Sequence, residues 1–425
     1  MRIITAEQYK RNERQTTIDQ TLDQIVLNII KDVQTNGDDA LRKYTNMFDN
    51  VDIDELVVTK QEFEDALEMV DDNFVAAIQA AIKNITRFHD LQKEQSWFMT
   101  RENGIMLGQH VTPIEKIGIY VPGGQADYPS TVIMNVIPAK IAGVPSISLT
   151  TPPQADGTIN PHVLTAARLV GIDRVYKIGG AQAIAALAYG TQSVDRVYKI
   201  VGPGNRYVAR AKKWVYGDVA IDMIAGPSEI CIVADESAPP SYVAADLLSQ
   251  AEHDEDATAI CITTDHMLAE AVRREVDEQR QSLERESIIK ESLAQNGRMI
   301  VVQSLQEAFD LVNDMAPEHL QLMIKDASLH VSNIRNAGAI FIGNYSPEPL
   351  GDYYAGPNHT LPTDGTATFS SPLGVYDFIK RSSIIHYSKG ALREASDDII
   401  TLARKEDLEA HAQSIQQRQR KENNI

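Results

Sequence analysis

Two neighbouring side chains, Glu318 and His319, form the sharpest candidate for acid–base chemistry, and they directly follow Pro317. The pKa of histidine lies nearest neutral pH, so His319 can take the proton from an alcohol. An adjacent glutamate can activate water. On local evidence alone, a solvated glutamate beside a partly buried histidine explains the same pattern equally well.

Possible metal ligands occur in two segments that precede and follow this pair. Gln250 and His253 are three residues apart at the end of an expected helix, so they share one face. Asp352 and His359 lie in a stretch framed by Gly and Pro. As local features, a histidine at a helix end more often caps the helix, and an aspartate in a turn more often bonds its own backbone.

A third segment near the C-terminus holds Glu406 and His411. On a solvent-facing helix the two would be unremarkable. Imidazole nitrogens and carboxylate oxygens nevertheless suit zinc, which accepts both donors. Because the spacing matches no compact zinc motif, any zinc centre must be assembled from distant segments.

Glycine-rich turns are the candidates for phosphate binding. They occupy 120–124, 179–182 and 202–205, each after an expected strand and before an expected helix, whose free amides can meet a phosphate. None completes the GxGxxG pattern of dinucleotide sites. Ordinary turns explain each of them alone.

Short apolar strands alternating with helices must position these residues. One series runs from Lys116 to 201 and a second from Glu229 to 343, after a mainly helical first hundred residues. The alternation predicts an α/β fold of two tandem, incomplete Rossmann-like units with parallel sheets, plus a helical N-terminal segment and a helical C-terminal tail. Ligands of such sheets bind beyond the carboxyl ends of the strands, where we expect the chemistry.

Two helical stretches are expected within the first hundred residues. One carries apolar residues at the 3.6-residue period and stops near Gly37, and the other covers about 60–92. The segment 344–368 is rich in Gly, Pro, Tyr and Asp and has little periodicity. A long irregular segment with aromatic and His content favours function.

Composition narrows the function classes. Of 425 residues, 43% are hydrophobic, and acidic residues outnumber basic ones 59 to 40, giving a formal net charge of -19. This charge disfavours nucleic-acid binding. The two cysteines, Cys231 and Cys261, lie in apolar runs typical of buried strands, which excludes a disulfide framework. With neither a secretion signal nor an apolar stretch of about 18 residues, we expect a cytoplasmic protein without membrane contacts.

Collinear motifs along nearly the whole chain resemble the histidinol dehydrogenase family. The motifs are YVPGG at 120–124, GGAQAIAAL at 179–187, KIVGPGN at 199–205, IDMIAGPSE at 221–229, LLSQAEHD at 247–254, APEHL at 316–320, GDYYAGPNHTLPT at 351–363 and LEAH at 408–411. One such motif would be weak evidence, whereas all of them in one order make a chance match very improbable.

The resemblance implies a role for each matched position. Gln250, His253, Asp352 and His411 match the family's zinc ligands, with one Zn2+ per subunit. Glu318 and His319 match its catalytic pair, and Tyr120, Gln182 and Asn205 match the positions that hold NAD. Substrate is held at Ser228, Gln250, His253, His319, Asp352, His359, Glu406 and His411.

The implied reaction is the oxidation of L-histidinol to L-histidine by two NAD+, through a bound aldehyde. It is the final step of histidine biosynthesis. The resemblance also implies a homodimer whose domain-swapped tails bring Glu406 and His411 into the neighbouring subunit's site. Three alternatives stay open: a paralogue oxidising another amino alcohol, a zinc hydrolase, and a non-catalytic, metal-stabilised scaffold.

We expect four parts of the chain on this basis. They are an N-terminal arm at 1–17, a discontinuous Rossmann-like domain at 18–119 and 229–371, an NAD-binding Rossmann-like domain at 120–228 and a C-terminal tail at 372–425.

Overall fold

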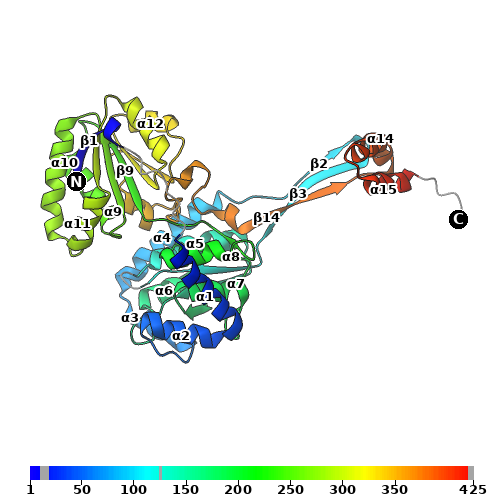
Figure 1. The fold of residues 1–425 in the computed structure, drawn as a ribbon, viewed down its shortest axis with the longest axis horizontal. Helices are drawn as coiled ribbons and strands as arrows, with labels where there is room; N and C mark the ends of the chain where they lie inside the picture. The colour runs from blue at the N-terminus through cyan, green and yellow to red at the C-terminus, as the bar shows by residue number, and fades with distance from the viewer. Residues whose placement is uncertain (10–18, 124–126, 420–425) are drawn as a thin grey trace. The chain divides into compact units, whose positions relative to one another are not determined.

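A computed structural model describes residues 1–9, 19–123 and 127–419 (Figure 1). The chain divides into two compact units. The larger comprises Met1–Gln92 and Ile114–Phe378, and the smaller comprises Lys93–Pro113 and Ile379–Ile425. No helix among the described residues is long and apolar enough to cross a membrane.

Within the larger unit, one parallel sheet has six strands in the order β1-β11-β10-β9-β12-β13. The strands are β1 (Arg2–Thr5), β9 (Glu229–Ala234), β10 (Thr258–Thr263), β11 (Arg298–Val301), β12 (His319–Met323) and β13 (Ala339–Ile342). Successive residues of β9 enter different cores, because Ile230 and Ile232 belong to one cluster and Cys231 and Val233 to the other. Burial on both faces explains the continuous apolar run of this strand.

Helices cover both faces of this sheet (Figure 1). They are α9 (Pro240–Ala251), α10 (His266–Gln279), α11 (Glu286–Gln295) and α12 (Leu305–Met315). Buried residues of the first three join the cluster that holds Ile232, and those of α12 join the cluster that holds Val233. The expected alternation of strands and helices in this half of the chain is therefore confirmed.

The other parallel sheet of the larger unit has five strands in the order β6-β5-β4-β7-β8. They are β4 (Lys116–Tyr120), β5 (Ser146–Thr151), β6 (Val175–Lys177), β7 (Lys199–Val201) and β8 (Ala220–Ile221). The connecting helices are α5 (Pro129–Ala142), α6 (Pro161–Leu169), α7 (Gly180–Tyr189) and α8 (Arg206–Val215). These elements confirm the first predicted strand–helix series.

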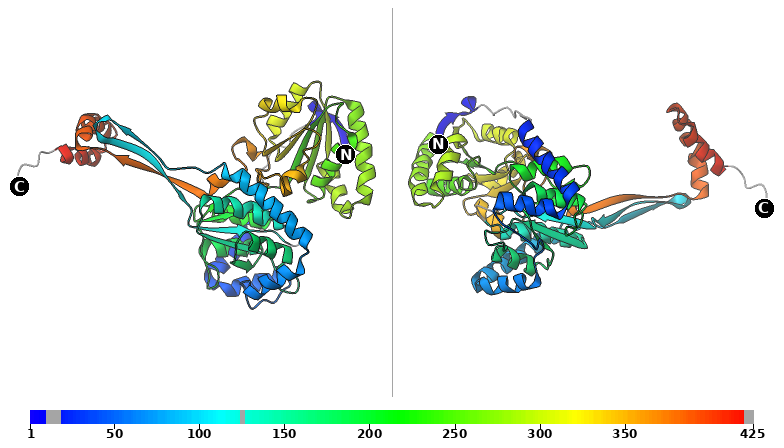
Figure 2. Two further views of the ribbon diagram at one scale, coloured as in Figure 1. Left: turned by 180° about the vertical axis from the view of Figure 1, so that it is seen from behind. Right: turned by 60° about the horizontal axis from the view of Figure 1, so that its bottom comes forward.

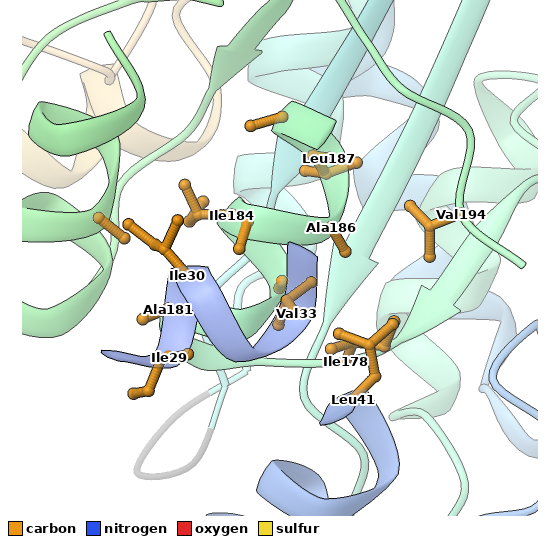
Figure 3. Packing of buried hydrophobic residues seen from close by; sticks show 14 of the residues in the cluster. Ile29, Ile30, Val33, Leu41, Ile178, Ala181, Ile184, Ala186, Leu187 and Val194 are labelled. Carbon is orange, nitrogen blue, oxygen red and sulfur yellow. The ribbon is translucent and has the colours of Figure 1, made fainter. Parts of the chain in front are cut away.

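The N-terminal helices pack against this five-stranded sheet. They are α1 (Gln20–Asn36), α2 (Asp38–Asp49), α3 (Lys60–Met69) and α4 (Asp72–Asp90). Ile30 and Val33 of α1, Leu41 of α2 and Ile184 and Leu187 of α7 belong to one buried cluster (Figure 3). The Asp19 side chain caps the start of α1, and the predicted stop is confirmed at Gly37, whose φ is 55°.

The grouping of segments around the sheets differs from the expected domain boundaries. The α1–α4 region, expected to belong with 229–371, shares its cores with 116–221 because its apolar helix faces fit α6 and α7. Part of the expected N-terminal arm forms strand β1, which pairs with β11 in parallel. The rest of that arm, from residue 10 onward, lies outside the described residues.

The smaller unit is a three-stranded antiparallel sheet followed by two helices (Figure 2). Its elements are β2 (Trp97–Arg101), β3 (Ile105–Pro113), β14 (Ile379–His386), α14 (Lys389–Lys405) and α15 (Glu409–Gln419). The helical tail was predicted, whereas this sheet was not. Among the described residues of this unit, the buried apolar cluster consists of Ile400, Ala403 and Ala412, and large apolar side chains such as Trp97, Phe98 and Ile385 are exposed.

Candidate functional site

The acid–base pair lies at the amino end of strand β12. His319 is the first residue of that strand and pairs in register with Ile230 of β9 and Ala339 of β13. The side chains of Glu318 and His319 are both buried. The expectation that candidate reacting residues follow the carboxyl ends of the strands is therefore wrong for this pair, because Glu318 directly precedes β12 and His319 is its first residue.

Backbone groups of Glu229 hold the pair in place. The Glu229 amide donates to Glu318 Oε2 at 2.9 Å, and its carbonyl oxygen lies 3.0 Å from His319 Nδ1. A carbonyl can only accept, so Nδ1 carries the proton and donates. His319 Nε2 is then the basic atom. It is buried, has no hydrogen-bond partner among the described atoms, and lies 3.6 Å from Asp352 Oδ1.

Asp352 belongs to the short helix α13 (Glu348–Tyr353). One ligand atom from each of His319, Glu348 and Asp352 lies within 4.8 Å of the other two. Glu348 was not among the predicted site residues. The four-residue spacing to Asp352, which places both carboxyl groups on one helix face, was the available signal.

Gln250 and His253 lie at the end of α9. The Ser249 hydroxyl, beside Gln250, donates to Glu348 Oε2 at 3.3 Å, which joins this helix end to α13. Gln250 is 1% exposed, and both polar atoms of its amide are buried without a hydrogen-bond partner in the described chain. An unpaired buried amide is costly, so its donors and acceptors are available for a ligand. His253 comes two residues after the helix and donates its backbone N–H to the Gln250 carbonyl at 3.2 Å.

The carboxyl groups and imidazoles of this cluster shift one another's pKa. Burial opposes the charged form of His319, but the neighbouring Glu318 and Asp352 outweigh it and raise its pKa to about 10. Burial raises the pKa of Glu318 and of Glu348 to about 8. Although burial acts the other way, the neighbouring imidazole of His319 lowers the pKa of Asp352 to about 2.

The two outer histidines are kept neutral by their surroundings. Burial lowers the pKa of His253 and of His359, while the charge of Asp352 partly offsets it in both cases. A neutral imidazole is the form that binds metals. His359 Nε2 also lies 3.4 Å from the Thr131 hydroxyl at the start of α5, so a helix of the five-stranded sheet borders the cluster.

A cavity of about 390 Å³ opens beside Asp352 and His359. Its walls are mainly apolar and include Phe341, Leu350 and Leu361. The His319 and Phe341 rings are 6.1 Å apart, so the basic histidine adjoins this wall. A mostly apolar cavity with a few converging polar groups is typical of a small-molecule site.

Three predicted substrate and metal residues remain, and they belong to different elements. Ser228 comes directly before β9, and its carbonyl accepts from the Thr258 amide at 2.9 Å, which places it at the same amino edge as the acid–base pair. Glu406 and His411 belong to the smaller unit, at the end of α14 and in α15, and both side chains are exposed.

The predicted NAD residues follow the carboxyl ends of strands in the five-stranded sheet. The Tyr120 hydroxyl, at the end of β4, accepts from the Gly180 amide at 3.0 Å. Gln182 in α7 is 1% exposed, with both amide atoms unpartnered among the described residues. Asn205 caps α8 by accepting from the amides of Tyr207 and Val208.

A buried ion pair holds the loop before Asn205. Lys212 contacts Asp222 and donates to the Gly202 carbonyl at 2.9 Å, and Asp222 Oδ2 accepts from the Gly202 amide at 2.8 Å. Gly202 has φ of 108°, and a Cβ there would lie 2.1 Å from the Tyr120 carbonyl oxygen. Glycine is therefore required where the loop passes β4.

Fold and site together define an α/β protein with a buried Glu–His pair beside a cluster of carboxyl groups and an imidazole that could hold a metal ion. The family model for histidinol dehydrogenase matches residues 12–419. The histidinol dehydrogenase of Oceanobacillus iheyensis is 56% identical over 100% of this chain and 99% of the relative, and that of Bacillus subtilis is 54% identical over 93% of each. The crystal structure of histidinol dehydrogenase from Elizabethkingia anophelis is 41% identical, covers 93% of this chain and 92% of that chain, and superposes with a TM-score of 0.90.

The chain therefore belongs to the histidinol dehydrogenase family, whose members are NAD-dependent oxidoreductases.

Proposed function

We propose that this chain oxidises L-histidinol to L-histidine with two NAD+, through an aldehyde that stays bound, as the last step of histidine synthesis. The observation that carries the proposal is the buried His319 Nε2, which has no hydrogen-bond partner among the described residues and lies 3.6 Å from Asp352 beside Glu318. The names of the relatives supply the substrate.

In the first half-reaction His319 Nε2 takes the hydroxyl proton of the alcohol, and the carbon releases a hydride to NAD+. The fixed Nδ1–H leaves Nε2 as the accepting atom. In the second half-reaction Glu318 removes a proton from water while the water oxygen adds to the aldehyde carbon, and His319 returns its first proton to the aldehyde oxygen, which forms the hydrate and leaves His319 neutral. The hydrate then releases its hydride to the second NAD+ and a proton to His319.

Zinc suits the residues at the end of α9 and on α13. We propose that Gln250, His253 and Asp352 hold it, together with the partner subunit's His411. The unpaired Gln250 amide and the neutral His253 support this donor set. When bound, the ion orients and polarises the substrate and offsets the charge of Asp352, which otherwise keeps the pKa of His319 high.

The other predicted residues are proposed to bind substrate and cofactor. Besides the metal ligands and His319, L-histidinol would contact Ser228, His359 and the partner subunit's Glu406. NAD would be held at the carboxyl edge of the five-stranded sheet by Tyr120, Gln182 and Asn205. The unpartnered amide of Gln182 supports that position.

We propose a homodimer because the smaller unit exposes apolar side chains that its own core does not cover. All residues of β2 are exposed, and Trp97, Phe98, Ile385 and Leu402 are each more than half exposed. Large exposed apolar surfaces mark protein interfaces. A second copy covering this unit would bring Glu406 and His411 to the partner's site by exchange of the tail at 372–425.

Subunit mixing tests the shared site. His319→Asn and His411→Asn each remove one histidine from every site of their own homodimers. Under the proposal, one of the two sites in every mixed dimer contains both histidines, because each comes from the subunit in which it is intact. After unfolding and refolding together, the mixture should recover about a quarter of wild-type activity by random assortment of subunits. Activity no higher than that of the separate variants would contradict a shared site.

The oxidation itself is tested with purified protein, L-histidinol and NAD+, with and without a chelator. We expect two NADH per histidinol consumed and loss of turnover when the metal is removed. One NADH per substrate, with free aldehyde as product, would refute the four-electron reaction. No NADH at all would refute the dehydrogenase.

A further inference from the structure

Lys212 and Asp222 form a buried ion pair to which the proposed reaction gives no task. Their side chains are 2% and 1% exposed, Lys212 on α8 and Asp222 directly after β8. Taking two charges out of water costs free energy, and apolar side chains of similar volume in place of such a pair are often neutral or stabilising. Stability of the fold alone therefore does not explain why charged groups occupy these two positions.

The pair bonds both polar backbone groups of Gly202, the buried residue that directly follows β7. Lys212 donates to the Gly202 carbonyl at 2.9 Å, and Asp222 Oδ2 accepts from the Gly202 amide at 2.8 Å. Asp222 Oδ1 contacts Lys212 and also accepts from the Met223 amide at 2.6 Å, which fixes the carboxylate to its own segment. An apolar pair would leave the buried amide and carbonyl of Gly202 without these partners. What the charged pair supplies is thus a fixed course for the chain at Gly202.

The chain that leaves Gly202 leads directly to the residues proposed to hold NAD. A Cβ at Gly204 would lie 3.1 Å from Tyr120 Cε1, so this segment runs against the Tyr120 ring. Asn205 ends the loop and caps α8. Lys212 is seven residues further along that helix, about two turns, and its side chain returns to Gly202. The loop is therefore held at one end by the ion pair and at the other by the cap.

We propose that Lys212 and Asp222 are positioning residues for NAD+. They hold the loop that follows Gly202 in the shape in which Tyr120 and Asn205 meet the cofactor. This inference rests on the proposed function, since it assumes that NAD binds at this edge of the five-stranded sheet. Without the pair the loop samples other shapes, and the apparent Kd for NAD+ rises in inverse proportion to the fraction of molecules that keep the receptive one.

Double variants separate the hydrogen bonds from the buried charges. Lys212→Met/Asp222→Leu removes both charges and all bonds to Gly202 while keeping similar side-chain volumes. Lys212→Met/Asp222→Asn differs only in the second residue, where asparagine keeps an oxygen that accepts from the Gly202 amide. Single variants are unsuitable, because they leave one buried charge unpaired. The control is Arg210→Met/Asp23→Leu, which removes an ion pair of 3.3 Å between the same helix and α1.

The experiment measures the Kd for NAD+ by calorimetry on the zinc-loaded protein, and kcat and KM with L-histidinol. We expect Lys212→Met/Asp222→Leu to raise the Kd and the KM for NAD+ about tenfold, as when about one molecule in ten keeps the receptive loop. At saturating NAD+ its kcat should stay within about twofold of wild type, because Glu318 and His319 belong to the other parallel sheet. The asparagine variant should fall between, and the control should bind NAD+ like wild type.

Hydrogen exchange followed by mass spectrometry gives a second readout, at the loop itself. Amides within 202–205 should exchange faster in Lys212→Met/Asp222→Leu than in wild type, whereas those of 209–215 should be unchanged. This pattern distinguishes a local loss of loop shape from general destabilisation of α8.

Wild-type affinity for NAD+ in the folded apolar variant overturns the positioning role. Equal weakening by the control overturns it as well, because loss of any ion pair on α8 would then suffice. If the apolar variant does not fold, Lys212→Met/Asp222→Asn decides, and a wild-type Kd in that protein overturns the role. A wild-type protein that binds no NAD+ instead refutes the proposed function, and the positioning role with it.

Discussion

Replacement of Gln250 by methionine should stabilise the metal-free protein while it weakens metal binding. Gln250 is 1% exposed, and neither polar atom of its amide has a hydrogen-bond partner among the described residues. Leaving a buried polar group unpaired costs about 1–3 kcal/mol. Methionine has a similar volume and no polar hydrogen, so the variant should gain about 1–3 kcal/mol in its free energy of unfolding.

Zinc should reduce or reverse this difference in the free energy of unfolding between the Gln250→Met variant and the wild type. A ligand that binds only the folded state adds about 2.7 kcal/mol when its concentration is 100 times its Kd. The wild-type protein, with the amide as ligand, gains that amount. The variant has lost one donor and gains less at the same zinc concentration.

Urea unfolding measured with a chelator, and again with excess zinc, gives the free energy of unfolding under each condition from the midpoint and slope of the transition. The comparison gives both the metal-free stability difference and the stabilisation by zinc. Asn313→Leu is the matched control, because the Asn313 amide is buried and fully bonded to Asn333, Arg335 and Asn336. Its replacement should destabilise the protein under both conditions by about 1–3 kcal/mol for each group left unpaired. A Gln250→Met protein that is no more stable than wild type without metal would show that the amide is already satisfied, and the metal assignment would lose its main structural support.

Three further predictions concern the reacting groups and the thiols. His319→Asn should lower kcat by about 10²–10⁴ with unchanged zinc content, as expected for a lost general base, and near-normal turnover would contradict the role. Glu318→Gln should slow aldehyde oxidation more than alcohol oxidation. Burial raises the pKa of Glu318 to about 8, so the rate of wild-type aldehyde oxidation should rise as pH rises through that value, where the basic carboxylate forms. Equal losses in both half-reactions, or a rate that falls through this pH range, would argue against water activation by Glu318. Because burial raises the pKa of Cys231 and brings that of Cys261 to about 12, a thiol reagent should leave the native protein unlabelled and fully active, which counting of released chromophore checks.

The strand–helix series could be predicted from the sequence because a strand that is buried on both faces consists of consecutive apolar residues. Strands β9 and β10 read as continuous apolar runs, and capping residues mark helix starts such as Asp19. The antiparallel sheet of the smaller unit shows no such sequence pattern. In β2 every side chain is exposed, so neither alternation nor an apolar run distinguishes it.

Strand β12 was missed for a related reason. Its sequence, HLQLM, contains His319 and Gln321, both buried, so polar residues occupy positions that a buried strand usually gives to apolar ones. The same two residues make hydrogen bonds, to the Glu229 carbonyl and the Asp246 side chain. These tertiary contacts bond one polar atom of each side chain, and local periodicity cannot indicate them.

The site itself was recoverable only by resemblance to a family. Gln250 and Asp352 are about a hundred residues apart in the sequence, and each alone suits an ordinary cap or turn. The physical signals that distinguish them are the unpaired buried amide of Gln250 and the closeness of the Asp352 carboxyl group to His319 and Glu348, and both appear only after folding. Glu348 shows the same limit, since its burial could not be read from EPLGDY.

The placement of the acid–base pair within a sheet constrains how this scaffold can acquire new substrates. Glu318 and His319 are held by backbone groups of Glu229, and a Cβ at Gly338 would lie 2.5 Å from the Glu318 carbonyl oxygen, so the neighbouring segment approaches the pair closely enough to require glycine there. Variation that broadens the range of accepted alcohols must therefore accumulate in the irregular walls around the cavity, such as Leu350 and Leu361, while the proton-transfer apparatus stays as it is.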